Sequence, residues 1–524
     1  MSKFLNGLID NTNYTLTENG GIAHKTTKSN LLDMFAMGAA MRNRPDEDVV
    51  LMFRKAYEEN PVYALKCLFY IRDIRGGQGE RRFFRLCIKD LAEHDPVAMR
   101  RNLKHIPEFG RWDDLYELVN TPVETDMWNF MRAQLALDVR SKTPSLLAKW
   151  MKSENTSSYD SKKLGRATRI AMHMTPRQYR KTLSILREHI NVLERLMSAG
   201  EWDKIEFDKI PSKAGMIYRN AFARHDVERM KMAVDTNIQS YEDFAKDTTK
   251  TVNAKDLYPY EIVGESINLT KYSRAHYWGS NDDSEIDPTQ RAIVNKYWDN
   301  YLNSFDDFKF NGIAVVDTSA SMLHYGDKSQ PMNIAISLGM CCAEKAIGPY
   351  HGHYISFSSR PQLVKVEGVD FVDKVRRIYE TNICENTNIE GVFDLLLKTA
   401  IDNNCTQDEI PENIIIISDM EFDSCAYSYP SGWRNMGNFT SFNRANVDTE
   451  LERIAKKWEK YGYKIPNLIF WNVDARQANL PMLGEGASFV SGMSPSIYKT
   501  IASGKTGYDL MMEVLDSERY EAVC

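Results

Sequence analysis

The sequence predicts an all-helical first part followed by an α/β domain with a doubly wound, mostly parallel sheet. Strand signals are nearly absent before residue 300, where amphipathic helical patterns dominate. After residue 310, short apolar runs alternate with helical stretches. A chain of 524 residues is long enough for two or three domains. We therefore expect a helical domain over residues 1–300 and an α/β domain over residues 305–524.

A glycine-rich stretch, RGGQGE at residues 75–80, separates two helical patterns in the first part. The preceding VYALKCLFYIRDI carries apolar side chains on more than one face, and RRFFRLCIKDLA resumes helical spacing afterwards. Two helices joined by a glycine turn are typical of an αα-hairpin.

The clearest single helix signal begins at Thr175. This residue is a good N-cap, Pro176 suits the first helical position, and Gln178 completes a capping box. Apolar residues then recur at spacings of three and four as far as Met197, and Gly200 is the expected end. We therefore expect one continuous helix. No strict repeat period connects the helical stretches, so helical repeats in this part would be irregular.

Residues 276–289, HYWGSNDDSEIDPT, are polar and turn-rich, and they predict a linker before a helix around residues 292–305. Beyond it, the apolar runs are GIAVVD, HYISFS, NIIIISD and NLIFWNV. The helical stretches between them are MNIAISLGMCCAEKA, IEGVFDLLLKTAI and LERIAKKWEKYG. This alternation indicates an open parallel sheet covered by helices on both faces. Ligands of such sheets bind at the carboxyl ends of the strands.

Oxygen-bearing side chains collect at these predicted strand ends. Asp317, Ser319 and Ser321 follow the run GIAVVD within a few residues, and Asp419 ends NIIIISD. Thr387 stands in the loop ENTNIEGVF before a helix. Mg²⁺ prefers about six oxygen ligands and readily keeps waters among them. The pattern predicts a site for Mg²⁺ or another divalent cation. With two carboxylates at most, that cation would keep a position open for an external anion.

This arrangement resembles the von Willebrand factor A domain and its metal-ion-dependent adhesion site. The family pattern is DxSxS, a Thr on a second loop, and an Asp after the next hydrophobic strand. The five residues above match it, but Asn386 stands where the family often has a glycine before the Thr. The resemblance implies a Rossmann-like doubly wound sheet and a cation that binds an acidic group of a partner or of the chain itself.

Three alternative roles for the DTSAS segment are less consistent with the sequence than a metal site. Helix capping alone would leave Asp419 and Thr387 without a role. The aspartic proteases use a similar DTG loop, but they need two such aspartates in an all-β fold. Haloacid-dehalogenase phosphotransferases need a second carboxylate where Ser319 stands. We therefore predict a non-enzymatic protein, with a metal-dependent enzyme as an alternative.

The charge of the chain is unevenly distributed. The net charge is −6, yet residues 162–231 hold sixteen Lys/Arg against eight Asp/Glu, which leaves about −14 for the rest. Basic side chains neutralise phosphates and release counterions, so this pattern favours nucleic acid. The predicted RNA-contacting residues are Arg72, Arg75, Arg81, Arg82, Lys149, Lys152, Arg166, Arg169, Arg177, Arg180 and Lys181. Tyr179 lies on an apolar stripe, so we expect it in the core.

The stretch RDIRGGQGERRFFR at residues 72–85 resembles the glycine turn in the TROVE module of the Ro ribonucleoprotein family. In that family a ring of irregular HEAT-like helical repeats, closed by a von Willebrand A domain, binds RNA. TLTENGGIAHKT, HIPEFGRWDDLYEL and LLAKWMKSENTSS resemble a related viral, bacterial and plant family of the same layout. The resemblance implies a ribonucleoprotein component that holds single-stranded RNA ends or a small structured RNA.

A protein-interaction scaffold, in which the metal recruits an acidic partner, is the main alternative to RNA binding. The aromatic stretch at residues 425–447 is expected to lie over the metal edge as a partner-binding loop or a lid, with packing on the helical domain as the alternative. Asp423 is expected near the metal. No apolar run reaches about 18 residues, and the first residues lack a secretory signal. The eight cysteines are scattered without a CxxC pair. We therefore expect a cytoplasmic protein without a membrane contact.

Overall fold

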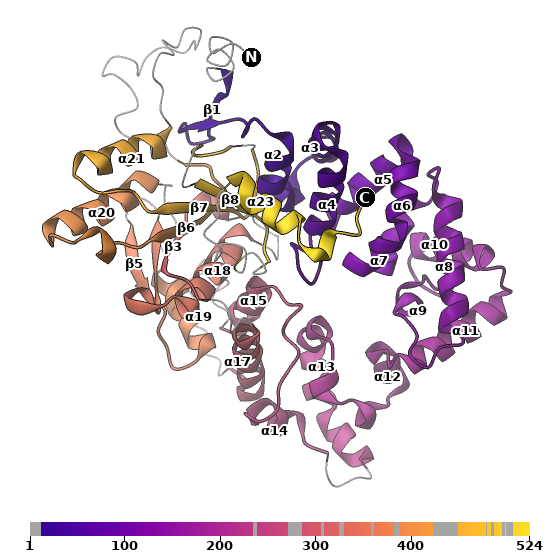
Figure 1. Cartoon of the computed structure of the whole chain (residues 1–524). Helices are drawn as coiled ribbons and strands as arrows, with labels where there is room; N and C mark the ends of the chain where they lie inside the picture. Colours follow the sequence, from indigo (N-terminus) through magenta and orange to yellow (C-terminus); the bar gives the residue numbers. More distant parts are fainter. Residues whose placement is uncertain are drawn as a thin grey trace. The chain divides into compact units, whose positions relative to one another are not determined.

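The computed structural model describes residues 12–233, 238–270, 286–304, 309–323, 330–357, 361–381, 388–422, 449–477, 479–483, 487–494, 498 and 507–524. The chain forms two compact units, each assembled from three separate segments (Figure 1). The sheet-bearing unit comprises Met1–Cys67, Tyr258–Ser284 and Phe305–Ser517. The helical unit comprises Leu68–Leu257, Glu285–Ser304 and Glu518–Cys524.

The helical unit confirms the prediction of a mostly helical first part. Its α-helices are α5 (Arg82–His94), α6 (Pro96–Asn102), α7 (Ile106–Phe109), α8 (Glu124–Asp138), α9 (Leu147–Trp150), α10 (Tyr159–Ala171), α11 (Pro176–His189), α12 (Leu193–Ala199), α13 (Ser212–Met232), α14 (Tyr241–Lys246) and α17 (Pro288–Asn303). Short 3₁₀ turns connect several of them, including η3 (Trp112–Leu118). Among the described helices, none has the length and apolarity needed to cross a membrane.

The predicted αα-hairpin consists of α4 (Pro61–Arg72), the glycine turn and α5. The backbone N–H groups of the turn are used internally: those of Gly77 and Gly79 donate to the Asp73 carbonyl at 3.2 and 3.0 Å. The buried Asp73 carboxylate accepts hydrogen bonds from Arg519 and, at 3.0 Å, from the Tyr520 hydroxyl. The turn is therefore held by hydrogen bonds within the helical unit. The amides of Gly77 and Gly79 are used in these bonds and do not face outward toward a phosphate.

The expectation of one helix between Thr175 and Gly200 was wrong, although both of its ends are confirmed. The capping box is present, and Gly200 ends α12 in the left-handed conformation. Between them, Asn191 adopts a left-handed φ of 48° and separates α11 from α12. Asparagine tolerates this conformation at helix ends, and the β-branched Ile190 and Val192 on either side lower the helical preference further.

The sheet-bearing unit contains a six-stranded sheet, which confirms the predicted fold class. The strands are β3 (Gly312–Asp317), β4 (His353–Phe357), β5 (Gln362–Lys365), β6 (Asn413–Ser418), β7 (Asn467–Asn472) and β8 (Ala487–Ser491). Their order is β5-β4-β3-β6-β7-β8, and only β5 runs antiparallel to its neighbour. Four strands lie on the predicted apolar runs. Two strands were not predicted: β5, which is a largely exposed edge strand without an apolar run, and β8.

Helices cover both faces of the sheet. The crossover connections place α18 (Pro331–Lys345) on one face and α20 (Ile389–Asp402) with α21 (Glu450–Lys460) on the other (Figure 1). The contact between α18 and β3 is close, because a Cβ on Gly339 would lie 2.4 Å from Val316. The other helices of this unit are α15 (Pro259–Thr270), which packs on α18, α19 (Phe371–Thr381) and α23 (Gly507–Leu515).

The first described residues also belong to the sheet-bearing unit. They form the hairpin of β1 (Tyr14–Leu16) and β2 (Ile22–His24), followed by α2 (Asn30–Met37) and α3 (Asp46–Glu59). Helix α2 packs against β8 and α23. His24 pairs its backbone with Leu480, and its ring lies 3.0 Å from the Glu452 carboxylate. These residues therefore contribute directly to the unit that carries the strand ends.

We predict that Gly77→Ala destabilises the helical unit, because the new Cβ would lie 2.0 Å from the Tyr70 carbonyl oxygen. Overpacking of this kind costs about 1–3 kcal/mol of unfolding free energy. The matched control is Gly264→Ala in α15, where no atom lies within 4 Å of the new Cβ and alanine favours the helix. Urea denaturation followed by circular dichroism measures both. Equal stability of the two variants would contradict the role assigned to the turn.

Candidate functional site

The candidate site lies where the strand order of the sheet reverses. Strands β3 and β6 are parallel neighbours at this point, with β4 on one side and β7 on the other. Asp317 ends β3 and Asp419 directly follows β6, so the two predicted aspartates meet at the carboxyl edge. Ligands of doubly wound sheets bind at this switch point. Thr387, Asp423 and residues 425–447 lie outside the described part of the chain.

A tight turn after β3 holds three of the predicted ligands together. The Ser319 amide donates to one oxygen of Asp317 at 2.9 Å, and the Ser418 hydroxyl donates to the other at 2.6 Å. The hydroxyl oxygens of Ser319 and Ser321 lie 2.9 Å apart. The turn therefore brings Asp317, Ser319 and Ser321 close together, as the sequence pattern predicts.

The electrostatics of the site are dominated by buried carboxylates. Asp317 is 0% exposed and Asp419 is 1% exposed. Burial and then the charge of Asp419 raise the pKa of Asp317 to about 7, although hydrogen bonds from Ser418 and Ser319 oppose the shift. Burial also raises the pKa of Glu421 to about 7, and Asp419 adds to that shift. A cation at this edge of the sheet would therefore be stabilised by the buried carboxylates.

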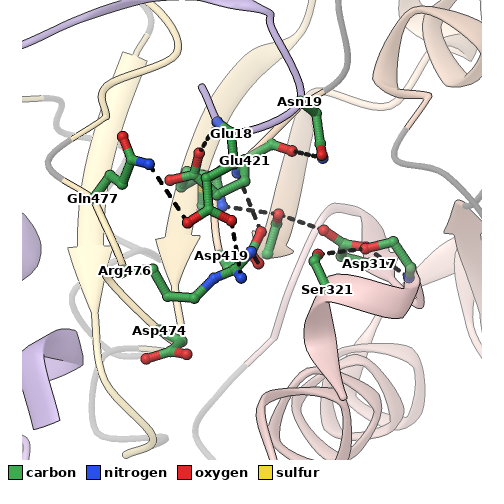
Figure 2. Close-up of polar contacts among 12 residues, drawn as sticks. Glu18, Asn19, Asp317, Ser321, Asp419, Glu421, Asp474, Arg476 and Gln477 are labelled. Carbon is green, nitrogen blue, oxygen red and sulfur yellow. Dashed lines mark hydrogen bonds and ion pairs between the residues drawn. The ribbon is translucent and has the colours of Figure 1, made fainter. Parts of the chain in front are cut away.

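Arg476 supplies part of that positive charge (Figure 2). Its guanidinium comes from the loop after β7, and one nitrogen lies 2.8 Å from the Asp419 carboxylate. A second nitrogen lies 3.0 Å from the carboxylate of Glu18, in the turn between β1 and β2. The Glu18 amide in turn donates to the Glu421 carboxylate at 2.7 Å. The guanidinium therefore pairs with one oxygen of Asp419 and compensates part of the negative charge at this edge.

Several of these residues were not predicted from the sequence. Arg476 follows the carboxyl end of NLIFWNV, so the rule that led to Asp419 would also have found it. Ser418 lies inside the apolar run NIIIISD. Its role becomes visible only in the structure, where its hydroxyl donates to Asp317 at the end of the neighbouring strand β3. Glu18 has no sequence signal, because its place depends on a hairpin that packs on a strand end about 400 residues later.

The donor set suits a hard cation by chemistry. Carboxylate and hydroxyl oxygens from Asp317, Ser319, Ser321 and Asp419 are the ligand types that Mg²⁺ prefers. Within the described ranges, no group of three or more His, Cys, Asp or Glu is arranged to hold a metal. Any cation at this edge would therefore depend on the serine hydroxyls as well as on the two aspartates.

Arg72, one of the predicted RNA contacts, forms a buried ion pair inside the helical unit. The Arg72 side chain is 1% exposed, and its guanidinium lies 2.8 Å from the buried carboxylate of Asp114. Arg85 lies 2.7 Å from the other oxygen of that carboxylate. This pairing connects α4 and α5 to η3 and leaves Arg72 inaccessible to a phosphate. The prediction that Arg72 contacts RNA was therefore wrong.

The other predicted RNA contacts fall into two groups. The half-buried ones are Arg82, Lys149, Lys152 and Arg169. Among them, Arg169 is already paired with Glu154 at 2.8 Å. The exposed ones are Arg75, Arg81, Arg166, Arg177, Arg180 and Lys181. Tyr179 is buried in the core, as expected.

An exposed basic surface belongs to α10 and α11, which we call the basic helices. Six side chains there have no ion-pair partner among the described residues: Lys162, Lys163, Arg166, Arg177, Arg180 and Lys181. Tyr159, at the start of α10, is 78% exposed, and Ile170 and Ile185 are also exposed. The basic helices therefore present unpaired cations together with apolar and aromatic side chains.

Comparison with known proteins gives two family matches. A model described as "Domain of unknown function (DUF2828)" matches residues 17–164 and 138–308. A model described as "Domain of unknown function (DUF7788)" matches residues 311–521. The two matches meet between residues 308 and 311, close to the start of β3.

Two individual proteins are similar over most of the chain. "Uncharacterized protein L728" of Acanthamoeba polyphaga mimivirus is 30% identical, over 94% of this chain and 85% of that protein. Among solved structures, the Deinococcus radiodurans Ro (RSR) protein is 13% identical with a TM-score of 0.47. That match covers 91% of this chain and 100% of the Ro chain.

We predict that Arg72→Met lowers the unfolding free energy by roughly 3 kcal/mol, because the buried Asp114 loses one of its charge partners. Arg75→Met is the control, since Arg75 is an exposed cation of the same glycine turn. Chemical denaturation of the two variants measures the difference. If Arg72→Met is as stable as Arg75→Met, the structural role of Arg72 is wrong.

Proposed function

We propose that this chain, which belongs to the DUF2828 family, is a non-enzymatic RNA-binding component of a ribonucleoprotein. The observation that carries the proposal is the basic helices, whose six cations have no ion-pair partner among the described residues. Unpaired exposed cations release the counterions of a phosphate backbone without first breaking an ion pair. The resemblance of residues 72–85 to the TROVE module of Ro proteins points to the same ligand.

The proposed ligand is a single-stranded RNA end or a small structured RNA. Single strands are bound by cationic tracks together with aromatic side chains on which bases stack. The exposed ring of Tyr159 lies on the same helix as Lys162, Lys163 and Arg166. A rigid duplex would not need such a ring, because its bases are already stacked.

We further propose that the edge of the sheet binds Mg²⁺ through Asp317, Ser319, Ser321 and Asp419. Thr387 is the fifth ligand that the sequence predicts. The buried Asp317, whose ionisation is opposed by the charge of Asp419, and the two convergent hydroxyls support this proposal. When bound, the cation would supply the positive charge that attracts an acidic group of a protein partner.

A protein-interaction scaffold is a second candidate. The exposed Ile170 and Ile185 on the basic helices favour it, because apolar side chains among cations also suit a protein partner. The two functions differ in their response to salt. The logarithm of RNA affinity depends linearly on the logarithm of the salt concentration, with a slope set by the number of phosphate contacts.

We predict that the triple variant Arg177→Gln, Arg180→Gln, Lys181→Gln weakens binding of a single-stranded RNA about tenfold or more at low salt. Its salt slope should be shallower by about 2, because three phosphate contacts are lost at about 0.7 each. Fluorescence anisotropy with a labelled 20-nucleotide RNA measures both quantities. The control removes three exposed lysines from the sheet-bearing unit: Lys398→Gln, Lys460→Gln, Lys464→Gln.

Wild-type protein that binds no RNA at low salt would overturn the ribonucleoprotein proposal. Equal losses in the two triple variants would show that overall charge, and not the basic helices, determines binding. A protein partner whose binding has little salt dependence would favour the scaffold.

We predict that MgCl₂ raises the melting temperature of the wild-type protein relative to EDTA, because a ligand of the folded state stabilises it. Asp317→Asn should abolish that increase. The variant should still fold in EDTA, since the amide removes a buried charge and can still accept the hydrogen bond of Ser418. Asp402→Asn, at an exposed position of α20, is the matched control. An equal Mg²⁺ response in Asp317→Asn would rule out the proposed site.

A further inference from the structure

A cleft in the sheet-bearing unit is lined by residues that the functions proposed above do not use. Its volume is about 330 Å³, and it lies between the loop before α2, helix α3 and the loop after β7. Ligand sites in proteins start at about 300 Å³, so the cleft has room for one small molecule. Its lining includes two lysines, Lys25 and Lys55, and four apolar side chains, Met37, Met41, Leu51 and Met52.

The cleft carries net positive charge, because its lining has three cations, Lys25, Arg44 and Lys55, and two carboxylates, Asp33 and Asp48. Both carboxylates have partners. Asp33 accepts hydrogen bonds from Thr26 and from the amide and hydroxyl of Thr27, and Asp48 lies 2.6 Å from the Arg44 guanidinium. Lys25 and Lys55 are exposed and have no ion-pair partner within the described ranges. Two unpaired ammonium groups at one cleft match the two charges of a phosphomonoester near neutral pH.

The same cleft has an apolar part. Met37 and Met41 are buried beneath it, whereas Leu51 is 50% exposed on α3. Thioethers make favourable contacts with aromatic rings and adapt to their shape. A flat aromatic group that packs on the exposed Leu51 would remove apolar surface of both from water. The lining therefore suits a ligand with a charged end and a planar end.

The walls of the cleft are held in place from both sides. Asp33 fixes the loop at residues 25–29, in which Lys28 adopts a left-handed φ of 73°. On the opposite wall, the Ala475 amide donates to the Ala40 carbonyl at 3.0 Å. A side-chain nitrogen of Arg42 donates to the Val473 carbonyl at 2.9 Å. A cleft fixed in this way loses little conformational entropy when a ligand binds.

We propose that this cleft binds a phosphomonoester that carries a planar aromatic group, as a nucleoside monophosphate carries its base. Lys25 and Lys55 neutralise the phosphate, and Leu51 with the methionines contacts the planar group. Two sources share this chemistry: a free mononucleotide and the phosphorylated end of an RNA. The proposal is independent of the basic helices and of the cation site.

The test uses the full-length protein, with AMP as the probe and EDTA present so that the cation site does not contribute. Isothermal titration calorimetry should show AMP binding, with adenosine and inorganic phosphate each at least tenfold weaker. Lys25→Gln with Lys55→Gln should weaken AMP binding at least tenfold. Leu51→Ser should weaken AMP binding severalfold but leave phosphate binding unchanged. The charge-matched control, Lys398→Gln with Lys464→Gln, should bind AMP like the wild type.

Absence of AMP binding by the wild type at about 1 mM, or equal binding by the Lys25/Lys55 variant, overturns the proposal. Unchanged AMP binding by Leu51→Ser overturns the planar part. A melting curve of each variant shows that it is folded. A 5′-phosphorylated RNA that displaces AMP, when its 5′-hydroxyl counterpart does not, identifies an RNA end as a source, whereas no displacement by either identifies a free nucleotide.

Discussion

The ending of β3 and β6 at one edge of the sheet is the constraint on which the sheet-bearing unit depends. It forces Asp317 and Asp419 into a buried site together, where the charge of Asp419 opposes the ionisation of Asp317. The unit offsets that repulsion with the hydroxyl of Ser418 and the guanidinium of Arg476. Because Arg476 also pairs with Glu18, the same compensation connects the hairpin of β1 and β2 to the edge of the sheet.

The helical unit shows how differently arginines of one protein are used. Arg72 and Arg85 converge on the carboxylate of Asp114, where their charges stabilise internal packing. Arg177 and Arg180 stand on an exposed face without ion-pair partners among the described residues. Sequence position beside a glycine turn therefore does not decide whether an arginine is buried in an ion pair or exposed.

Periodicity and strand ends in the sequence predicted the fold class, four strands of the sheet and the meeting of Asp317 with Asp419. These features are local, and parallel strands place their ends together by geometry. Features that depend on distant partners were not predictable. Arg72 matched an RNA-binding pattern, and only the position of Asp114 beside it reveals a structural role. The break at Asn191 lay within an unbroken apolar stripe, and Glu18 gained its role only from tertiary contacts.

The assembly of each unit from distant segments has a consequence for how the chain folds during synthesis. The turn after β1 bonds to Phe422, and α2 packs on β8 and α23, so these segments reach their partners only after residues about 400 positions further along the chain have been made. Asp73 likewise acquires its partners only when Arg519 and Tyr520 have been made. Contacts of such high sequence separation slow folding, because long loops must close first. The contacts of α2 and of Asp73 therefore form only after β8, α23 and Arg519 have been synthesised.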